Sequence, residues 1–140
     1  MSTQTDHDKT HPHRAVKVCN SAQELAEAYL EAQNNKNRQA LLDLVYWGDV
    51  SDRKKVEEIA CATLGKNVLL DVVVTPIKKS FQEISMRGFF LKGERFVPNL
   101  SIDAVLTPKS EKGGGQVEIG QHEGRWYIVA HIPQPRRQDI

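Results

Sequence analysis

The sequence predicts an α+β domain in which N-terminal helices pack on a curved antiparallel sheet. Apolar residues recur at helical spacing up to Gly65, and valine-rich or aromatic runs separated by turn residues fill the second half of the chain. No strand pattern alternates with a helical one, which excludes a doubly wound parallel sheet and its nucleotide site. The 140 residues, 39% apolar and 26% charged, are typical of one soluble globular domain.

The first two predicted helices lie between Ser21 and Tyr46. Ser21–Glu24 forms a capping box, and the helix behind it extends to about Asn34. A second, short helix is expected from about Arg38 to Tyr46, where leucines and a valine share one stripe.

The third helix has an apolar stripe on one side only. Ser51 or Asp52 can cap its start, and Gly65 stands where helices usually end. Because Ile59 lies at the centre of the stripe, we expect its side chain in the core.

The second half is expected to form antiparallel strands joined by hairpins. The predicted segments are Val68–Thr75, Phe81–Leu91, Glu94–Val97, Ser101–Thr107, Gln116–Gln121 and Arg125–Ile132. The valine-rich Val68–Thr75 suits a strand that is buried on both faces. Lys92-Gly93 and Glu123-Gly124 are two-residue hairpin signals.

Composition argues against several classes of partner and cofactor. The net charge is +1, and the longest basic run, Arg53–Lys55, lies among acidic residues, so nucleic-acid binding is not expected. There is no apolar run of about 20 residues, so we expect no membrane span. No phosphate-binding loop occurs, and no cofactor is expected. Without an apolar leader the protein is expected to be cytoplasmic, the alternative being an exported form whose signal has been removed.

The two ends of the chain are expected to be tails. Residues 1–20 show no periodicity, and residues 134–140 follow a proline that ends the last strand, which leaves a domain over 21–133. His7, His11 and His13 could hold a metal loosely, but their spacing matches no structural site, and we expect none. Cys19 and Cys61 form no Cys-x-x-Cys pair, so neither a disulfide scaffold nor a zinc site is indicated.

Three segments resemble a known superfamily. They are Ala22–Leu30 in the first helix, Leu41–Trp47 leading into the third, and Ile119–Val129 in the last hairpin, where a glycine turn precedes an aromatic-rich strand. Their order is similar to that of the nuclear-transport-factor-two-like (ketosteroid-isomerase-like) superfamily, over about Ser21 to Pro133. The resemblance implies a conical fold, in which the first helix and a curved sheet enclose a cavity. It does not choose among the superfamily's enzymes, ligand carriers and dimerisation modules.

The first functional hypothesis is a non-catalytic module that binds a small apolar ligand or dimerises. Tyr29 is on the first helix's apolar stripe, where its hydroxyl either reaches a cavity or packs in the core. Tyr46 and Trp47 either close the mouth of a pocket or plug the core. These three residues are the candidate ligand contacts.

The alternative is a small-molecule isomerase or lyase. The resemblance implies a strand carboxylate as base and a tyrosine or a protonated acid as oxyanion donor. The candidates for the base are Asp71 and Asp103. Asp71 interrupts an apolar run, so it is either a partly desolvated base or an outward residue; Asp103 alternates with apolar neighbours and looks solvent-facing. His131, on the last strand, is either catalytic or a hydrogen-bonded core residue.

The last predicted strand also suggests self-association. If Arg125–Ile132 is one strand, Tyr127 and Val129 share a face with His131, and the opposite face is apolar too. With no later helix to cover the second face, a two-fold homodimer through Tyr127 and Val129 is expected.

Overall fold

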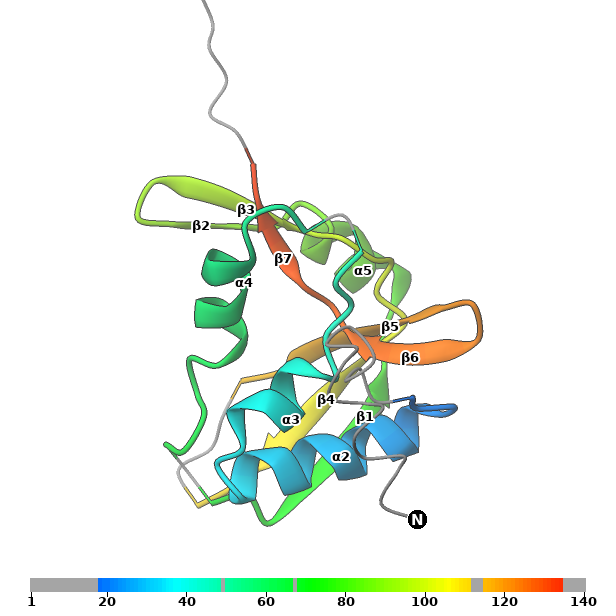
Figure 1. Ribbon diagram of the computed structural model, residues 1–140. Helices are drawn as coiled ribbons and strands as arrows, with labels where there is room; N and C mark the ends of the chain where they lie inside the picture. Colours follow the sequence, from blue (N-terminus) through cyan, green and yellow to red (C-terminus); the bar gives the residue numbers. More distant parts are fainter. Residues whose placement is uncertain (1–17, 49, 67, 112–114, 135–140) are drawn as a thin grey trace, which may run out of the picture.

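The computed structural model describes residues 18–48, 50–66, 68–111 and 115–134. It confirms the α+β class, with helices packed on antiparallel sheets (Figure 1). Within these residues the helices are α2 (Ala22–Asn34), α3 (Arg38–Leu42), α4 (Arg53–Ala60) and α5 (Lys79–Ser85). The strands are β1 (Asp71–Pro76), β2 (Phe89–Leu91), β3 (Glu94–Pro98), β4 (Ala104–Lys109), β5 (Val117–His122), β6 (Arg125–Ile128) and β7 (His131–Pro133).

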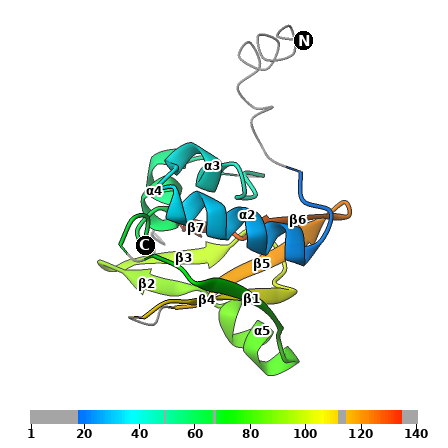
Figure 2. The ribbon, with the colours of Figure 1, turned by 90° about the horizontal axis from the view of Figure 1, so that it is seen from below.

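The strands form two antiparallel sheets. One has four strands in the order β1-β4-β5-β6, and the other has three in the order β2-β3-β7. Helices α2 and α3 lie on one side of the four-stranded sheet, whereas α5 lies on the other side (Figure 2). Helix α4 packs beside β7 (Figure 1). No helix in the described part of the chain is long and apolar enough to cross a membrane.

The predicted helix starts are confirmed. The Ser21 hydroxyl accepts a hydrogen bond from the Glu24 amide at 3.1 Å, and the Glu24 carboxylate accepts one from the Asn20 amide at 2.9 Å. Asp52, one of the two proposed caps, accepts from the Lys55 amide at 3.2 Å. These side chains satisfy backbone donors that the first turn of a helix leaves without partners.

The core lies between α2, α3 and the four-stranded sheet. Its most enclosed side chains include Leu25 on α2, Leu41 on α3, Leu106 on β4 and Ile119 on β5. Alternate residues of a strand point to the same face, so Ala104 and Leu106 meet the helices together.

Both predicted tails are shorter than expected, as far as the described residues extend. Cys19 is buried in the core, and its carbonyl accepts a hydrogen bond from the Trp126 amide at 2.9 Å. Gln134 donates its amide to the Arg95 carbonyl at 2.8 Å. The folded part therefore includes both residues. Positions 1–17, with the three histidines, and 135–140 lie outside the described residues.

The predicted strand Phe81–Leu91 is wrong over most of its length. Lys79–Ser85 forms α5, and only Phe89–Leu91 is a strand. Phe81 and Ser85, four residues apart, line the same cavity, so tertiary contacts favour a helical period in this segment. Gly88, with φ of 79°, turns the chain between α5 and β2.

The predicted last strand is also wrong as a single element. It divides into β6 and β7, which belong to different sheets. At the break, Val129 donates its amide to the Glu118 carbonyl, and Ala130 donates its amide to the Asn99 side chain. The Asn99 amide group also donates to the carbonyls of Tyr46 and Gly48, each at 3.0 Å. One asparagine side chain thus holds the corner where the chain changes sheets.

The valine-rich segment is not buried on both faces. The strand begins only at Asp71, lies at the edge of its sheet, and buries Val72 alone. Leu70, just before it, is 68% exposed. Both hairpin predictions are confirmed: Lys92-Gly93 and Glu123-Gly124 each have two consecutive positive φ angles, as a type I′ turn requires.

Candidate functional site

A cavity of about 510 Å³ lies between α2, α4, α5 and the strands β2, β5 and β7. Most of its lining is apolar or aromatic. The lining residues are Tyr29, Val56, Ile59, Ala60, Thr63, Phe81, Ser85, Phe89, Gln116, Val117, Glu118, Ile128, Val129, Ala130 and His131. Its volume is in the range of small-molecule sites.

A hydrogen-bonded acid–histidine pair forms one polar part of the wall. His131 Nε2 lies 2.9 Å from Glu118 Oε1, and the two side chains are only 18% and 17% exposed. The break between β6 and β7 places His131 against β5, the strand that carries Glu118. The Phe89 ring lies 5.1 Å from the imidazole, centroid to centroid, and limits its movement.

A second polar group enters from α2 and the turn after α4. The Tyr29 hydroxyl accepts a hydrogen bond from Gln33 Nε2 at 3.0 Å, and the same nitrogen lies 3.2 Å from Thr63 Oγ1. Burial raises the pKa of the Tyr29 phenol, and the hydrogen bonds to Gln33 and Thr63 offset this in part. The phenol therefore stays protonated at neutral pH, with its hydroxyl held among protein partners.

Among the described residues of the cavity wall, none has a cationic side chain of fixed charge. Its titratable members are Tyr29, Glu118 and His131, and no lysine or arginine is among its described lining residues. Two basic residues of α4 are paired outside the cavity wall. Lys55 pairs with Glu94 at 2.9 Å, and Arg53 pairs with Glu57.

The two candidate aspartates do not line the cavity. Asp71 is exposed, and its carboxylate accepts a hydrogen bond from the amide of its neighbour Val72 at 2.8 Å. Asp103 is exposed as well and accepts from the Gln121 amide at 3.0 Å. Both carboxylates make local contacts with strand backbone. Of the three catalytic candidates, the structure places only His131 at the cavity.

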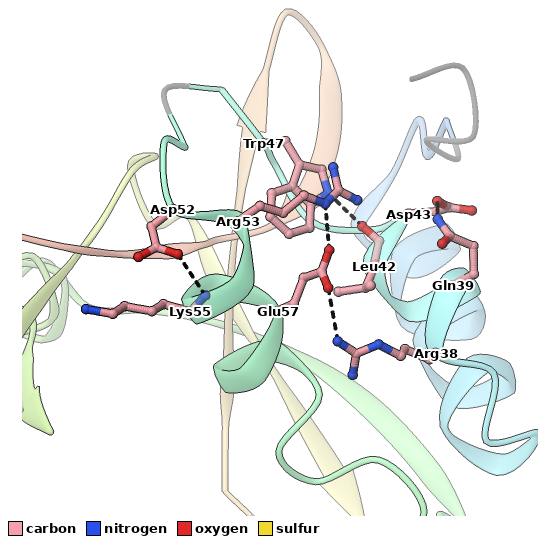
Figure 3. Close-up of polar contacts among 9 residues, drawn as sticks. All are labelled: Arg38, Gln39, Leu42, Asp43, Trp47, Asp52, Arg53, Lys55 and Glu57. Atoms are coloured by element: carbon pink, nitrogen blue, oxygen red, sulfur yellow. Dashed lines mark hydrogen bonds and ion pairs between the residues drawn. The ribbon is translucent and has the colours of Figure 1, made fainter. Parts of the chain in front are cut away.

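Tyr46 and Trp47 are likewise absent from the cavity wall. The Tyr46 ring lies against the rings of His122 and Tyr127, at centroid distances of 4.8 and 5.4 Å. Trp47 donates its indole N–H to the Leu42 carbonyl at 2.9 Å (Figure 3). The Tyr46 ring therefore packs with other rings, and the Trp47 indole is hydrogen-bonded to the chain.

Trp47 belongs to a charged cluster that joins α3 to α4 (Figure 3). The Arg53 guanidinium lies 4.2 Å from the centroid of the Trp47 ring, and Glu57 pairs with both Arg53 and Arg38. The hydrogen bond from Arg53, helped by Arg38, lowers the pKa of Glu57. These contacts hold α3 and α4 together, and this structural role accounts for the charged residues of the cluster.

The two proposed interface residues lie in different surroundings. Val129 is 4% exposed and lines the cavity, so it is not on an open sheet face. Tyr127 is half-buried against Tyr46. Tyr127 and Val129 would share a face only on an uninterrupted strand, whereas β6 ends at Ile128 and β7 begins at His131 in the other sheet.

Ile59 is a cavity residue and lies outside the tightly packed core. Val56 is the buried residue of α4, while Ile59 is half-buried and lines the cavity. Val56, Ile59 and Ala60 line the cavity together, as the predicted stripe requires, but α4 ends at Ala60 and does not reach Gly65. Periodicity does not tell whether a stripe meets packed side chains or a hollow.

Glu118 is the cavity residue that sequence reasoning missed. It lies between Val117 and Ile119, where a carboxylate on an alternating strand is typical of a solvent face. The sequence offers one signal for Glu118. Its predicted strand is joined by a hairpin to the predicted strand that carries His131, so the carboxylate and the imidazole could form a pair.

No family model, curated protein or solved structure matches the chain. Among the described residues, no three histidine, cysteine, aspartate or glutamate side chains come together as a metal site.

Proposed function

We propose that this domain binds a small, largely apolar molecule in the cavity between α4, α5 and the sheets. The observation that carries the proposal is the combination of an apolar cavity of about 510 Å³ with one hydrogen-bonded polar pair, Glu118 and His131. Ligand sites have this composition: apolar walls provide binding energy, and a few polar groups fix the orientation of the ligand.

We also propose that the fold is a variant of the nuclear-transport-factor-two-like cone. In the described part of the chain, three helices precede an antiparallel sheet, and Tyr29 of α2 lines a cavity, which supports the proposal. Helix α5 and the division of the strands into two sheets depart from a simple series of hairpins.

Filling the cavity is expected to abolish binding of an apolar probe. Ile59→Trp adds a large ring at a half-buried lining position, so the affinity for the neutral dye N-phenyl-1-naphthylamine should fall at least about tenfold, the equivalent of about 1.4 kcal/mol. Dye fluorescence titrated against protein measures this. Circular dichroism checks that the variant is folded.

Ile84→Trp is the matched control. Ile84 is on α5 but 61% exposed and absent from the cavity wall, so its replacement should leave dye affinity unchanged. Equal dye affinity for Ile59→Trp and the unmodified protein would place the bound dye elsewhere and refute the cavity as its site.

The enzyme alternative, an isomerase or lyase, is favoured by one observation. Glu118 and His131 lie within hydrogen-bond distance of each other, as a pair that acts in general acid–base catalysis requires, and Tyr29 lines the same cavity. This pair would take the role that had been considered for Asp71 or Asp103. Most of the lining is apolar and supports binding of a ligand whether or not a reaction follows, so ligand binding is the preferred function. Turnover that is lost in Glu118→Gln while dye binding persists would support the alternative.

Self-association is proposed through a different surface from the one first considered. Strand β2 is at the edge of its sheet, and all three of its side chains are exposed, with Phe90 at 72%. Because a two-residue loop makes Leu91 and Glu94 a hydrogen-bonded pair, the backbone groups of Phe90 point to the open edge. A second copy can pair there about a two-fold axis at Phe90.

Phe90→Glu is expected to prevent this pairing, since two carboxylates would meet at the axis. Sedimentation should show dimers for the unmodified protein at micromolar concentrations and monomers for the variant. Val68→Glu, at an equally exposed position (71%) outside β2, should remain dimeric. An unmodified protein that is monomeric throughout would contradict the proposal.

A further inference from the structure

We infer that the ligand of this cavity is a compact apolar amine, bound as its ammonium form by Glu118. The inference rests on the proposed ligand-binding function and adds the chemical class of the ligand. It comes from the charges of the wall, the hydrogen-bonding capacity of the acid–histidine pair, and the aromatic lining.

The charges of the wall favour a cation over an anion. With a neutral imidazole that donates Nε2–H to Glu118, the pair carries one net negative charge. No lysine or arginine among the described lining residues offsets it. A carboxylate or phosphate ligand would enter a site without a cationic partner of fixed charge and face the Glu118 carboxylate. Charges in such poorly solvated surroundings are costly unless they are paired.

The carboxylate retains an oxygen that can accept a hydrogen bond from a ligand. His131 engages Oε1, and no other hydrogen bond to Glu118 is found within the described part of the chain. In the same part, every enclosed side-chain nitrogen or oxygen has a hydrogen-bond partner. The second oxygen of Glu118 is therefore not enclosed, and an ammonium group can donate to it.

The rest of the cavity suits the apolar body of such a ligand. Tyr29, Phe81 and Phe89 contribute aromatic rings to the wall, and aliphatic side chains make up most of the remainder. Aromatic faces attract organic cations, which adds to the preference of the carboxylate. His131, held between Glu118 and the Phe89 ring, positions the carboxylate.

Three naphthalene probes of nearly the same shape test the inference. They are 1-naphthylmethylamine as the cation, 1-naphthalenemethanol as the neutral compound and 1-naphthoate as the anion. Dissociation constants are measured by NMR titration of the whole chain at about pH 8. The amine is expected to bind about 10- to 100-fold more tightly than the alcohol, the value of one charge-assisted hydrogen bond, and the naphthoate most weakly.

Glu118→Gln tests the role of the carboxylate. Glutamine keeps the shape and an acceptor for His131 but removes the charge, so the amine should lose its advantage over the alcohol while the alcohol binds as before. Glu83→Gln removes the same charge from an exposed position on α5 outside the cavity wall and should leave the preference intact.

The failures of the two proposals are distinguishable. If the alcohol binds but the amine shows no preference, or if naphthoate binds best, the amine class is refuted and the binding cavity stands. A preference that survives in Glu118→Gln also refutes it. If none of the three probes shifts the signals of cavity residues, both the amine class and the binding function are refuted.

Discussion

Leu106→Ala is expected to lower the free energy of unfolding by about 2–5 kcal/mol. Leu106 is in β4, between its partners Val74 on β1 and Val117 on β5, and none of its surface is exposed. Removing its three outer carbons leaves a void between the sheet and α2, because neighbouring strands are hydrogen-bonded on both sides and cannot move in to fill it. Denaturant unfolding followed by circular dichroism measures the change.

Leu70→Ala is the matched control for this core substitution. It removes the same atoms from a side chain that is 68% exposed, just before β1. Its effect should stay within about 0.5 kcal/mol, as for surface changes in general. Similar losses in the two variants would show that the core between α2 and the sheet has been wrongly placed.

Gly88→Ala is expected to destabilise the fold by about 2–5 kcal/mol, through two separate effects. Gly88 has a φ of 79°, a conformation that costs an alanine about 1–2 kcal/mol. A Cβ at this position would also run into the backbone carbonyl of Phe96 on the neighbouring strand, which adds about 1–3 kcal/mol of overpacking. The turn from α5 into β2 would have to shift, and with it Phe89 at the cavity wall.

Gly93→Ala separates the two effects. Gly93 has nearly the same φ, 81°, but an added Cβ would have no atom within 4 Å. Only the conformational cost should remain, so thermal or denaturant unfolding should show a smaller loss than for Gly88→Ala. Equal losses would mean that Gly88 is not in close contact with β3.

Ser21, Asp52 and the two glycine hairpins were predictable because their signals are local. A cap is made within three residues of its hydroxyl or carboxylate, and a type I′ turn depends on the φ angles of two neighbours. The α+β class followed in the same way, from periodicities that a short window contains. Tyr29 and His131 could be proposed as site residues because each places a hydrogen-bonding group, a hydroxyl or an imidazole, among apolar neighbours.

Other features depended on contacts between distant parts of the chain. Nothing local in Arg125–Ile132 indicates a break; Asn99, some thirty residues earlier, holds the corner through Ala130. The sequence of Phe81–Ser85 predicts part of a strand, but these residues are helical in α5, where Phe81 and Ser85 line the same cavity. The prediction that Tyr127 and Val129 share one face was wrong for the same reason. Side chains alternate between faces only within a strand, and β6 ends at Ile128, before Val129.

By itself the sequence determined the class of the fold, the starts of three helices and two of its turns. Only the tertiary structure decided which side chains share the cavity, that Glu118 is one of them, and that Asp71 and Asp103 are not. The physical reason is the range of the interactions. Caps and turns are stabilised by atoms a few residues apart. The described lining of the cavity comes from α2, α4, α5 and strands of both sheets, so its composition depends on how these elements pack.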